Sequence, residues 1–536
     1  MTRLLLLMAT LFATANCLAA GYSVTQITNT NYTNEYPKLN TKGDMVWAAG
    51  VNPADPGWTL FLYNADTKTS SAISDANVFY DSHLINAKGD VSWLGYDGHD
   101  YEIYLYSAAT QTTRQLTNND NDDTNPQLSD NGNVSWFELT PNQVPTQVLM
   151  NYDAATMVTT PLVFTGATRQ GLKIMNADGD IAWAADIDGN QDILLYKAAS
   201  KTINNISNGV SYISSNEALL DSGDIVWEAY DSLTYTYSLM RYNSADGSTT
   251  TIATDIDGFM VGNEGDIVWT TVSSGTYAIN TYDPMTEASK VIATNSGYQF
   301  NLAGISARGD VAWRTINGTN WLAQVYNAET GNTVDLTVTQ AYGAYELHIA
   351  DNGDVAWSLW DGTDYEVSTY QTASGTFNQL SNNNADDGVI TMNANGTLAW
   401  DRWDPAGGQL FLAVKSNNEL TLDVSKVKLD RRDSEIKLLA EFSGATIPSP
   451  ADIIAIHVDG ATLVSAPLAK FRQNNAGVYK YQSKDTLVII DFNRGMLKAS
   501  SESIVTKAFK VNDGMEIRVD FGSASAVANY TIKPRK

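Results

Sequence analysis

Hydrophobic and polar residues alternate in short runs from residue 21 to about residue 416, and clusters of Gly, Asn and Asp separate the runs. Runs such as EIYLYS (102–107) and DILLYK (192–197) put their apolar side chains on one face of an extended chain, as β-strands do. The clusters between the runs are typical of hairpin turns. The pattern therefore predicts a long series of antiparallel β-hairpins.

The runs belong to a repeat that reads Gly-Asp-hydrophobic-x-Trp, with small variations. Its tryptophans are Trp47, Trp93, Trp136, Trp183, Trp227, Trp269, Trp313, Trp357 and Trp400. They lie 42 to 47 residues apart, and each unit holds four strand-like runs. Four strands in every ~40–45 residues is the period of β-propeller blades. We expect the tryptophans to pack between blades and the Gly-Asp pairs to form the turns before their strands.

The ninth unit lacks a fourth strand, and the chain starts with a strand that has no unit. After GTLAW (396–400) the ninth unit continues through DRWDPAGGQLFLAVKS and stops. Residues 23–28, SVTQIT, resemble the fourth strand of other units. Pairing this stretch with residues 409–414 would close a ring and remove two sheet edges. The prediction is a propeller over residues 21–416 with nine four-stranded blades. The alternative is eight blades and a flanking sheet.

Residues 1–20 have the pattern of a secretory signal peptide, with Arg3, an apolar run from Leu4 to Ala9 and small residues at Ala19 and Ala20. No later run approaches ~18 apolar residues, so no transmembrane segment is expected. The one cysteine, Cys17, lies inside this leader. A lipoprotein would keep it, but the residues before it do not fit a lipobox. The sequence thus predicts a secreted or periplasmic protein without disulfides.

Residues 419–536 lack the repeat and differ in charge. Runs such as DIIAIHVDG and TLVIIDFN between turn residues predict a separate β-sandwich. This segment holds 17 basic and 14 acidic residues, a net charge of +3, whereas residues 21–418 hold 15 and 46, a net of −31. So acidic a region repels nucleic acid and anionic lipid. Its acidity serves either solubility or a cation-binding surface.

The repeats resemble the TolB-like (PD40-type, WD40-like) propeller repeats of bacterial envelope and secreted proteins. Those repeats typically read N-x-x-P-x-x-S-x-D-G-x-x-hydrophobic-x-aromatic and continue through a Gly turn into IY-x-Y. NPQLSDNGNVSWF (125–137) and DGHDYEIYLYSAATQTTRQLT (97–117) match best. This chain uses Trp where many relatives have Phe, and most of its units lack the Pro. The resemblance implies a propeller, and such propellers serve as protein-binding scaffolds, peptidase domains and lyases.

Acidic loops and aromatic residues are expected to meet on one face of the propeller. In an up-and-down blade, the loop before strand one and the hairpin between strands two and three lie at the same end. These segments are rich in Asp, as in 96–102, 118–125, 186–192, 360–366 and 382–388. The residue three after the repeat Trp is aromatic in four units, namely Tyr96, Tyr230, Trp360 and Trp403. These four are candidate ligand-binding residues, and Trp360 and Trp403 could form a platform for sugar rings.

DIDGNQD (186–192) is a candidate calcium loop, because Asp186, Asp188, Asn190 and Asp192 alternate as the first ligands of such loops do. The glycine comes two positions too early for an EF-hand, and no bidentate Glu follows. An ordinary hairpin explains the same residues. Calcium is thus an optional cofactor, and no other is expected.

Catalytic chemistry has few candidates. His83 and His348 precede repeat strands in units two and eight, on strands expected to be innermost, so they could face a central channel. Arg314 directly follows a repeat Trp, and Arg402 comes two residues after one. A lyase would use such a base and such a cation. No G-x-S-x-G elbow is present.

These observations favour a binding or scaffold protein that recognises a carbohydrate or protein partner on an acidic face. A propeller-type polysaccharide lyase or glycoside hydrolase is the alternative. A cluster of His, Tyr and Arg in the channel would favour the alternative.

Overall fold

A computed structural model divides the chain into two compact units, Met1–Lys415 and Ser416–Lys536. In the first unit the structure describes residues 17–19, 22–30, 32–50, 57–75, 77–140, 146–207, 213–296, 298–317, 320–336, 344–403 and 408–415. In the second it describes residues 421–430, 435–443, 453–458, 461–474, 478–491, 496–501, 515–521 and 524–530. The predicted signal peptide lies almost wholly outside these residues.

The first unit consists of successive antiparallel sheets, here called blades. Blade 1 holds β3 (Thr33–Leu39), β4 (Met45–Gly50), β5 (Thr59–Asn64) and β6 (Thr69–Ala72). Blade 2 holds β7 (Leu84–Ile85), β8 (Val91–Tyr96), β9 (Tyr101–Ser107) and β10 (Thr112–Gln115). Blade 3 holds β11 (Asp123–Leu128), β12 (Val134–Leu139), β13 (Gln147–Asp153) and β14 (Val158–Pro161). Blade 4 holds β15 (Ala167–Met175), β16 (Ile181–Ile187), β17 (Asn190–Lys197) and β18 (Thr202–Asn205).

The remaining blades follow the same plan. Blade 5 holds β19 (Ile213–Leu219), β20 (Ile225–Asp231), β21 (Thr236–Tyr242) and β22 (Thr249–Thr254). Blade 6 holds β23 (Ile256–Val261), β24 (Ile267–Ser273), β25 (Thr276–Asp283) and β26 (Ala288–Ser296). Blade 7 holds β27 (Phe300–Ile305), β28 (Val311–Asn317), β29 (Asn320–Asn327) and β30 (Asn332–Asp335). Blade 8 holds β31 (Ala344–Ile349), β32 (Asp354–Trp360), β33 (Tyr365–Gln371) and β34 (Thr376–Gln379). Blade 9 holds β35 (Asp387–Met392), β36 (Leu398–Arg402) and β37 (Gln409–Lys415).

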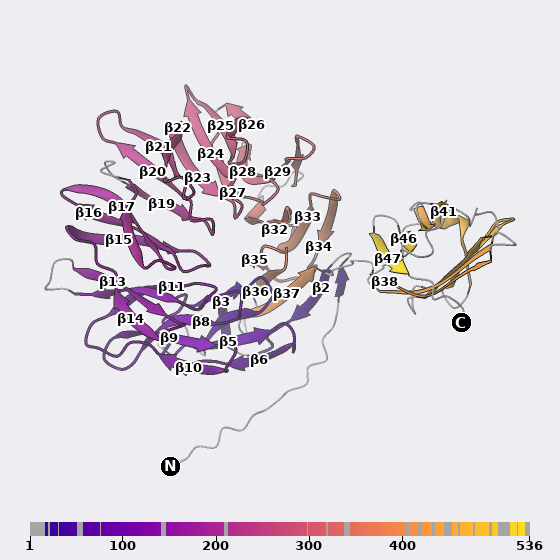
Figure 1. The fold of residues 1–536 in the computed structure, drawn as a ribbon, viewed down its shortest axis with the longest axis horizontal. Helices are drawn as coiled ribbons and strands as arrows, with labels where there is room; N and C mark the ends of the chain where they lie inside the picture. The colour runs from indigo at the N-terminus through magenta and orange to yellow at the C-terminus, as the bar shows by residue number, and fades with distance from the viewer. Residues whose placement is uncertain are drawn as a thin grey trace, which may run out of the picture. The chain divides into compact units, whose positions relative to one another are not determined.

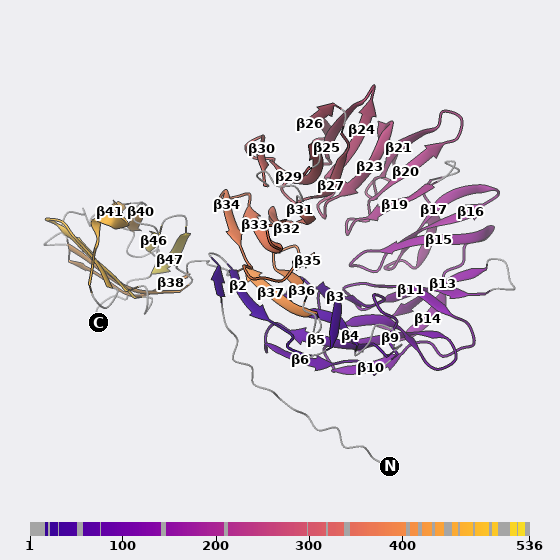
Figure 2. The ribbon, with the colours of Figure 1, turned by 180° about the vertical axis from the view of Figure 1, so that it is seen from behind.

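The blades stand around a ring, with their first strands toward its centre (Figures 1 and 2). Blade 9 lies beside blade 1, because β35 packs against β3. This arrangement of four-stranded antiparallel sheets is a β-propeller, as the repeat predicts.

The N-terminal strand β2 (Tyr22–Gln26) completes blade 9, as predicted. It runs antiparallel to β37, with Tyr22 opposite Lys415 and Gln26 opposite Phe411. Tyr22 and Val24 are buried in a core that also contains Trp400 and Phe411. A short strand, β1 (Cys17–Ala19), pairs with the outer edge of β2.

The repeated Gly-Asp-x-x-Trp segment builds the interior of each blade. Every repeat tryptophan is at most 4% exposed, which confirms the expected burial. The glycines take left-handed turns, as at Gly43 and Gly89, both with a φ of 88°. The aspartates have a role that the sequence did not suggest. Asp44 and Asp180 accept backbone N–H groups of Ala65 and Ala198, each at 2.8 Å. These hydrogen bonds join the turn before strand two to the turn after strand three.

Several innermost strands contain a bulge. Register shifts occur in β3, β11 and β31. The bulged residues Tyr36, Asn125 and Glu346 have φ angles of 55°, 52° and 49°. A bulge leaves backbone groups without ladder partners, and buried backbone groups need partners elsewhere. The next blade supplies them in two cases. His83 lies against the Tyr36 carbonyl, and Lys173 donates to the Asn125 carbonyl.

The second unit is a β-sandwich of two sheets in its described residues. The first sheet holds β38 (Thr421–Asp430), β39 (Glu435–Ser443), β45 (Met496–Ser501), β44 (Thr486–Asp491), β43 (Val478–Gln482) and β42 (Arg472–Gln473). The second holds β41 (Ala461–Pro467), β40 (Ile453–Val458), β46 (Met515–Phe521) and β47 (Ala524–Tyr530). A 3-10 helix, η1 (Leu468–Lys470), follows β41. Residues from both sheets, such as Ile436, Ile456, Ile490 and Val519, share one core.

Candidate functional site

Five aromatic rings adjoin one another at one end of blades 1 and 2. Neighbouring ring centres are 5.2 to 5.7 Å apart along the series Tyr36, Tyr80, Phe79, Tyr101 and Tyr96. Phe79, Tyr80 and Tyr96 are 42%, 48% and 42% exposed. We call these five residues the aromatic surface. A continuous group of partly exposed rings offers a platform for an apolar or sugar ring.

Hydrogen bonds and an ion pair hold the loop and the bulge that carry the aromatic surface. Phe79 donates its backbone N–H to the Leu94 carbonyl at 2.9 Å, and Lys38 forms an ion pair of 3.0 Å with Asp81. His83 lies under the bulge, fully buried, with its Nε2 2.8 Å from the Tyr36 carbonyl oxygen. Burial lowers the pKa of His83 to about 4. The ring is therefore neutral at pH 7 and donates from Nε2.

This placement corrects the expectation that His83 faces a channel. A fully buried imidazole that supports a backbone carbonyl cannot abstract a proton from a polymer. His348 lies in β31 and is only partly buried, opposite Ala356.

The other candidate aromatic residues occupy equivalent hairpins. In each, an aromatic residue at or next to the end of strand two lies opposite the first aromatic residue of strand three. The cross-strand pairs are Tyr96 with Tyr101, Tyr230 with Tyr237, and Trp360 with Tyr365. Their ring centres are 5.5, 4.9 and 5.3 Å apart. Sequence reasoning identified the first member of each pair and missed the second.

Trp403 and the Trp360 hairpin lie next to each other. Asp386 joins them, because its side chain accepts the Tyr365 N–H at 3.1 Å and its carbonyl accepts the Trp403 N–H at 2.9 Å. Trp403 is 65% exposed and Trp360 is partly exposed. The repeat tryptophans three residues earlier, Trp357 and Trp400, are each 1% exposed. The expected contrast in burial is therefore observed.

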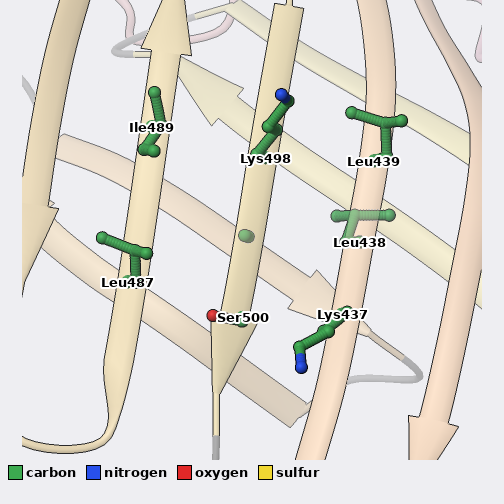
Figure 3. A pocket seen from close by; sticks show the side chains of 8 residues that line it. Lys437, Leu438, Leu439, Leu487, Ile489, Lys498 and Ser500 are labelled. Carbon is green, nitrogen blue, oxygen red and sulfur yellow. The ribbon is translucent and has the colours of Figure 1, made fainter.

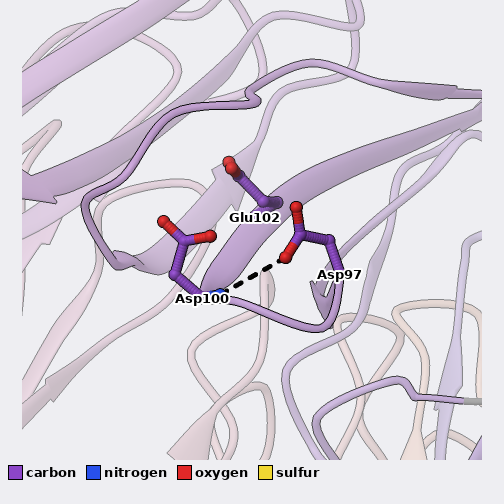
Figure 4. A group of neighbouring side chains, drawn as sticks. All are labelled: Asp97, Asp100 and Glu102. Carbon is purple, nitrogen blue, oxygen red and sulfur yellow. Dashed lines mark hydrogen bonds between the residues drawn. The ribbon is translucent and has the colours of Figure 1, made fainter.

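Two acidic groups occupy equivalent hairpins of blades 2 and 8. In blade 2, carboxylate oxygens of Asp97, Asp100 and Glu102 lie within 4.8 Å of one another (Figure 4). We call this group the blade-2 acidic cluster. In blade 8, Asp361, Asp364 and Glu366 repeat it. In both hairpins the first Asp caps the turn, as when Asp97 accepts the His99 N–H at 2.8 Å. Burial raises the pKa values of the other two carboxyl groups in each hairpin.

The first strand of the next blade adds a buried carboxyl group beside each hairpin. Asp123 and Asp387 are both fully buried. Burial raises the pKa of Asp123 well above its usual value, and the Glu102 carboxylate adds to the rise. Asp387 instead accepts hydrogen bonds of 3.2 Å from Trp400 Nε1 and Arg402 Nε. The candidate cation Arg402 therefore has a structural partner, and it also lies over the Phe411 ring.

The candidate calcium loop of blade 4 is a tight hairpin. Ile187 lies opposite Asn190, and the two turn residues, Asp188 and Gly189, have φ angles of 51° and 86°. Asp192 is buried and accepts a hydrogen bond of 2.9 Å from Ser207. Among the described residues, the groups whose carboxylates converge do not include Asp186, Asp188 or Asp192.

Two further carboxyl groups, those of Glu346 in β31 and Asp401 in β36, lie near each other on inner strands of blades 8 and 9. A methyl group added at Gly388 would stand 3.1 Å from Glu346 Oε2 and 3.2 Å from Asp401 Oδ1, so the two side chains flank Gly388. Burial raises the pKa of Glu346 to about 7, and Asp401 adds to this. Burial also raises the pKa of Asp401 to about 6. The nearby Arg314 guanidinium, which lies 5.5 Å from the centre of the Trp321 ring, opposes the rise at Glu346.

Trp321 also lines a hollow of about 450 Å³ between residues of blades 6 and 7. Phe259, Asn301 and Gln299 line it as well, and Gln299 donates to Asp257 at 2.9 Å. It offers an aromatic wall and polar groups.

A further hollow lies on the outer face of the six-stranded sheet in the second unit (Figure 3). Leu439 and Ile489 stand on either side of Lys498, and Lys437 and Leu487 on either side of Ser500. The hollow is a shallow apolar strip with lysines among its side chains.

No protein-family model matches the chain, and no curated protein matches it in sequence. Similar solved structures include dipeptidyl peptidase 4 of Porphyromonas gingivalis, with 11% identity over 69% of this chain and a TM-score of 0.48. They also include TolB from Acinetobacter baumannii (14%, 55% of this chain and 79% of that chain, TM-score 0.27). The β-propeller domain of the Trilobed protease from Pyrococcus furiosus is another (11%, 57% and 98%, TM-score 0.35). The chain spans 65% of the length of the peptidase. No helix that the structure describes is long and apolar enough to cross a membrane.

Proposed function

We propose that the protein is a secreted or periplasmic binding protein that recognises a neutral carbohydrate through its aromatic surface. The observation that carries the proposal is the series of partly exposed rings from Tyr36 to Tyr96, which continues into Asp97. Aromatic faces stack on the C–H faces of sugars, and carboxylates accept hydrogen bonds from hydroxyl groups. The exposed Trp403 and the Trp360 hairpin provide a second, similar platform.

Charge selects among carbohydrates. Residues 21–418 carry a net charge of −31, and the aromatic surface adjoins acidic residues. This field repels uronate and sulfate polymers and tolerates uncharged ones. The proposal therefore commits to a neutral polysaccharide. A protein ligand remains an outcome of the test, since exposed aromatic residues also anchor protein partners.

Removing rings should weaken binding and leave the fold intact. The test is affinity electrophoresis through gels that contain xyloglucan, galactomannan or laminarin. We expect one of them to retard the wild type, and Tyr80→Ala with Tyr96→Ala to weaken binding by about 1–3 kcal/mol per ring. Partly exposed side chains contribute little to stability, so the unfolding temperature should hardly change.

Two variants serve as comparisons. Tyr235→Ala removes a 78% exposed tyrosine outside the aromatic surface and should bind as the wild type does. Trp360→Ala with Trp403→Ala measures the second platform. If no neutral polysaccharide retards the protein, or if Tyr235→Ala weakens binding as much as the double variant, the proposal fails.

Glycoside hydrolysis is the second candidate, because the inner carboxyl groups of Glu346 and Asp401 flank one glycine and have raised pKa values. A protonated and an ionised carboxyl group near one bond are what this reaction uses. Release of reducing sugar by the wild type, abolished in Glu346→Gln, would support hydrolysis. A wild type that binds but releases none would exclude it for that sugar.

A further inference from the structure

The blade-2 acidic cluster and the equivalent acidic group of blade 8 lie in hairpins of the same sequence pattern. They differ in whether a positively charged arginine lies near the carboxylates. Both hairpins have the pattern aromatic-Asp-Gly-x-Asp-Tyr-Glu, at residues 96–102 and 360–366. Both are followed by a buried aspartate on the next blade, Asp123 or Asp387. The residue opposite this aspartate on strand two is Glu138 in blade 3 and Arg402 in blade 9.

The acidic group of blade 8 therefore has a positive charge near it, Arg402 of blade 9. Arg402 and Trp400 both donate to Asp387, and Asn383 donates to its other oxygen. Near the blade-2 acidic cluster, the equivalent of Arg402 is one more carboxylate, Glu138 of blade 3, which accepts a hydrogen bond from Asn121 at 3.0 Å. Buried carboxylates without compensating charge are costly. Among the residues that the structure describes, the blade-2 acidic cluster has no counterpart of Arg402.

One carboxylate of the cluster has no hydrogen-bond donor. Asp100 is only 5% exposed, and both of its oxygens are buried without a donor, as are those of its counterpart Asp364 in blade 8. The basic side chain beside it is the largely exposed His99, whose Nδ1 is 3.6 Å away. One Asp100 oxygen lies within 4.8 Å of oxygens of Asp97 and Glu102 (Figure 4). Glu102 also has one buried oxygen without a donor, Oε2, whereas both oxygens of its counterpart Glu366 accept hydrogen bonds, from the Ser381 hydroxyl and the Asn383 N–H.

We propose that the blade-2 acidic cluster binds one calcium ion through Asp97, Asp100 and Glu102, and that Arg402 of blade 9 takes the place of such an ion for the acidic group of blade 8. Calcium takes six to eight oxygen ligands at about 2.3–2.6 Å, which places neighbouring ligand oxygens at the separations seen here. Waters can fill the remaining positions, because the Asp97 side is exposed. Three carboxylates in flexible geometry suit calcium better than magnesium, which demands a strict octahedron.

The inference is independent of the proposed carbohydrate binding, because calcium can be titrated without any sugar. The ion would hold the hairpin that carries Tyr96 and Tyr101, so it would also keep that part of the aromatic surface in place. A chain that binds calcium but no carbohydrate would contradict the proposed function alone.

The experiment is a calorimetric titration of the full chain, freed of metal with EDTA, with calcium chloride. We expect one ion per chain with a Kd of about 10⁻⁴–10⁻³ M or lower, the range of extracellular calcium modules. Asp100→Asn should weaken binding at least tenfold. Asp364→Asn, the same change in blade 8, should leave it unaltered. No binding up to 10 mM calcium (about ten times the weakest expected Kd), equal binding by Asp100→Asn, or loss of binding in Asp364→Asn would each overturn the proposal.

A second variant keeps the test independent of folding defects in Asp100→Asn. Glu138→Arg installs in blade 3 the cation that blade 9 has, and leaves all three proposed ligands in place. We expect this variant to lose both calcium binding and the rise in unfolding temperature that calcium gives the wild type. A Glu138→Arg protein that is folded and still binds calcium as tightly as the wild type would show that charge compensation is not the reason for the site.

Discussion

Removal of residues 21–29 is expected to lower the free energy of unfolding by about 3–6 kcal/mol. Tyr22 and Val24 of β2 are buried against blade 9, and burial of one such side chain is worth about 1.5–3 kcal/mol. The deletion also leaves β37 with an unpaired edge in place of its ladder to β2, which favours aggregation. Urea unfolding and size-exclusion chromatography of the shortened chain measure both effects.

Single substitutions separate the loss of the strand from the loss of its buried residues. Val24→Ala should destabilise the protein, whereas Thr25→Ala, at a partly exposed position of the same strand, should have little effect. A shortened chain with the wild-type unfolding temperature would mean that β2 does not close the propeller.

Stability of the propeller is expected to decrease by about 1–3 kcal/mol between pH 4.5 and pH 8 through Glu346, because solvent screening of this partly exposed group reduces the effect of its raised pKa. Burial, with Asp401 as a second cause, raises the pKa of its carboxyl group from 4.5 to about 7. The folded state therefore holds a proton that the unfolded state loses, and each pKa unit corresponds to about 1.4 kcal/mol. This contribution is complete below pH 4.5, and it disappears as the pH rises through 7.

Glu346→Gln removes this titration. Relative to the wild type it should be more stable at pH 8 and no more stable at pH 4.5, as measured by urea unfolding at both values. Glu264→Gln, in an exposed turn, is the control and should change little at either pH. An equal effect of Glu346→Gln at both pH values would contradict the raised pKa.

Features that repeat could be predicted from the sequence. The tryptophans recur in every unit, and a large apolar residue at one place in each strand has one way to be buried. The position of β2 could also be predicted, because the ninth unit lacks a fourth strand and the N-terminal strand has no unit of its own. The two complete one sheet. The fold class rests on the period of the repeat and on its four strand-like runs, and the structure confirms a β-propeller of four-stranded antiparallel sheets.

Features that depend on register between blades could not be predicted. The bulge at Tyr36 turns a carbonyl toward the next blade, and His83 is buried there for that reason. Nothing in the alternation of residues marks a bulge. Phe79 and Tyr80 join the aromatic surface through a loop that precedes a strand of only two residues, β7. The acidic hairpins did leave a signal, because YDGHDYE and WDGTDYE are nearly identical. Their similarity indicated ordinary hairpins, and the buried carboxylates became apparent only from the packing of the next blade.

The central claim, that the aromatic surface binds a neutral carbohydrate, is tested most directly by hydrogen–deuterium exchange. The exchange of backbone amides is measured with and without a fragment of the polysaccharide that retards the protein. Our account predicts slower exchange in residues 77–82 and 95–102, around Phe79, Tyr80 and Tyr96, and no change in residues 344–349 and 398–402. Protection around Glu346 and Asp401 with none at the aromatic surface would contradict it.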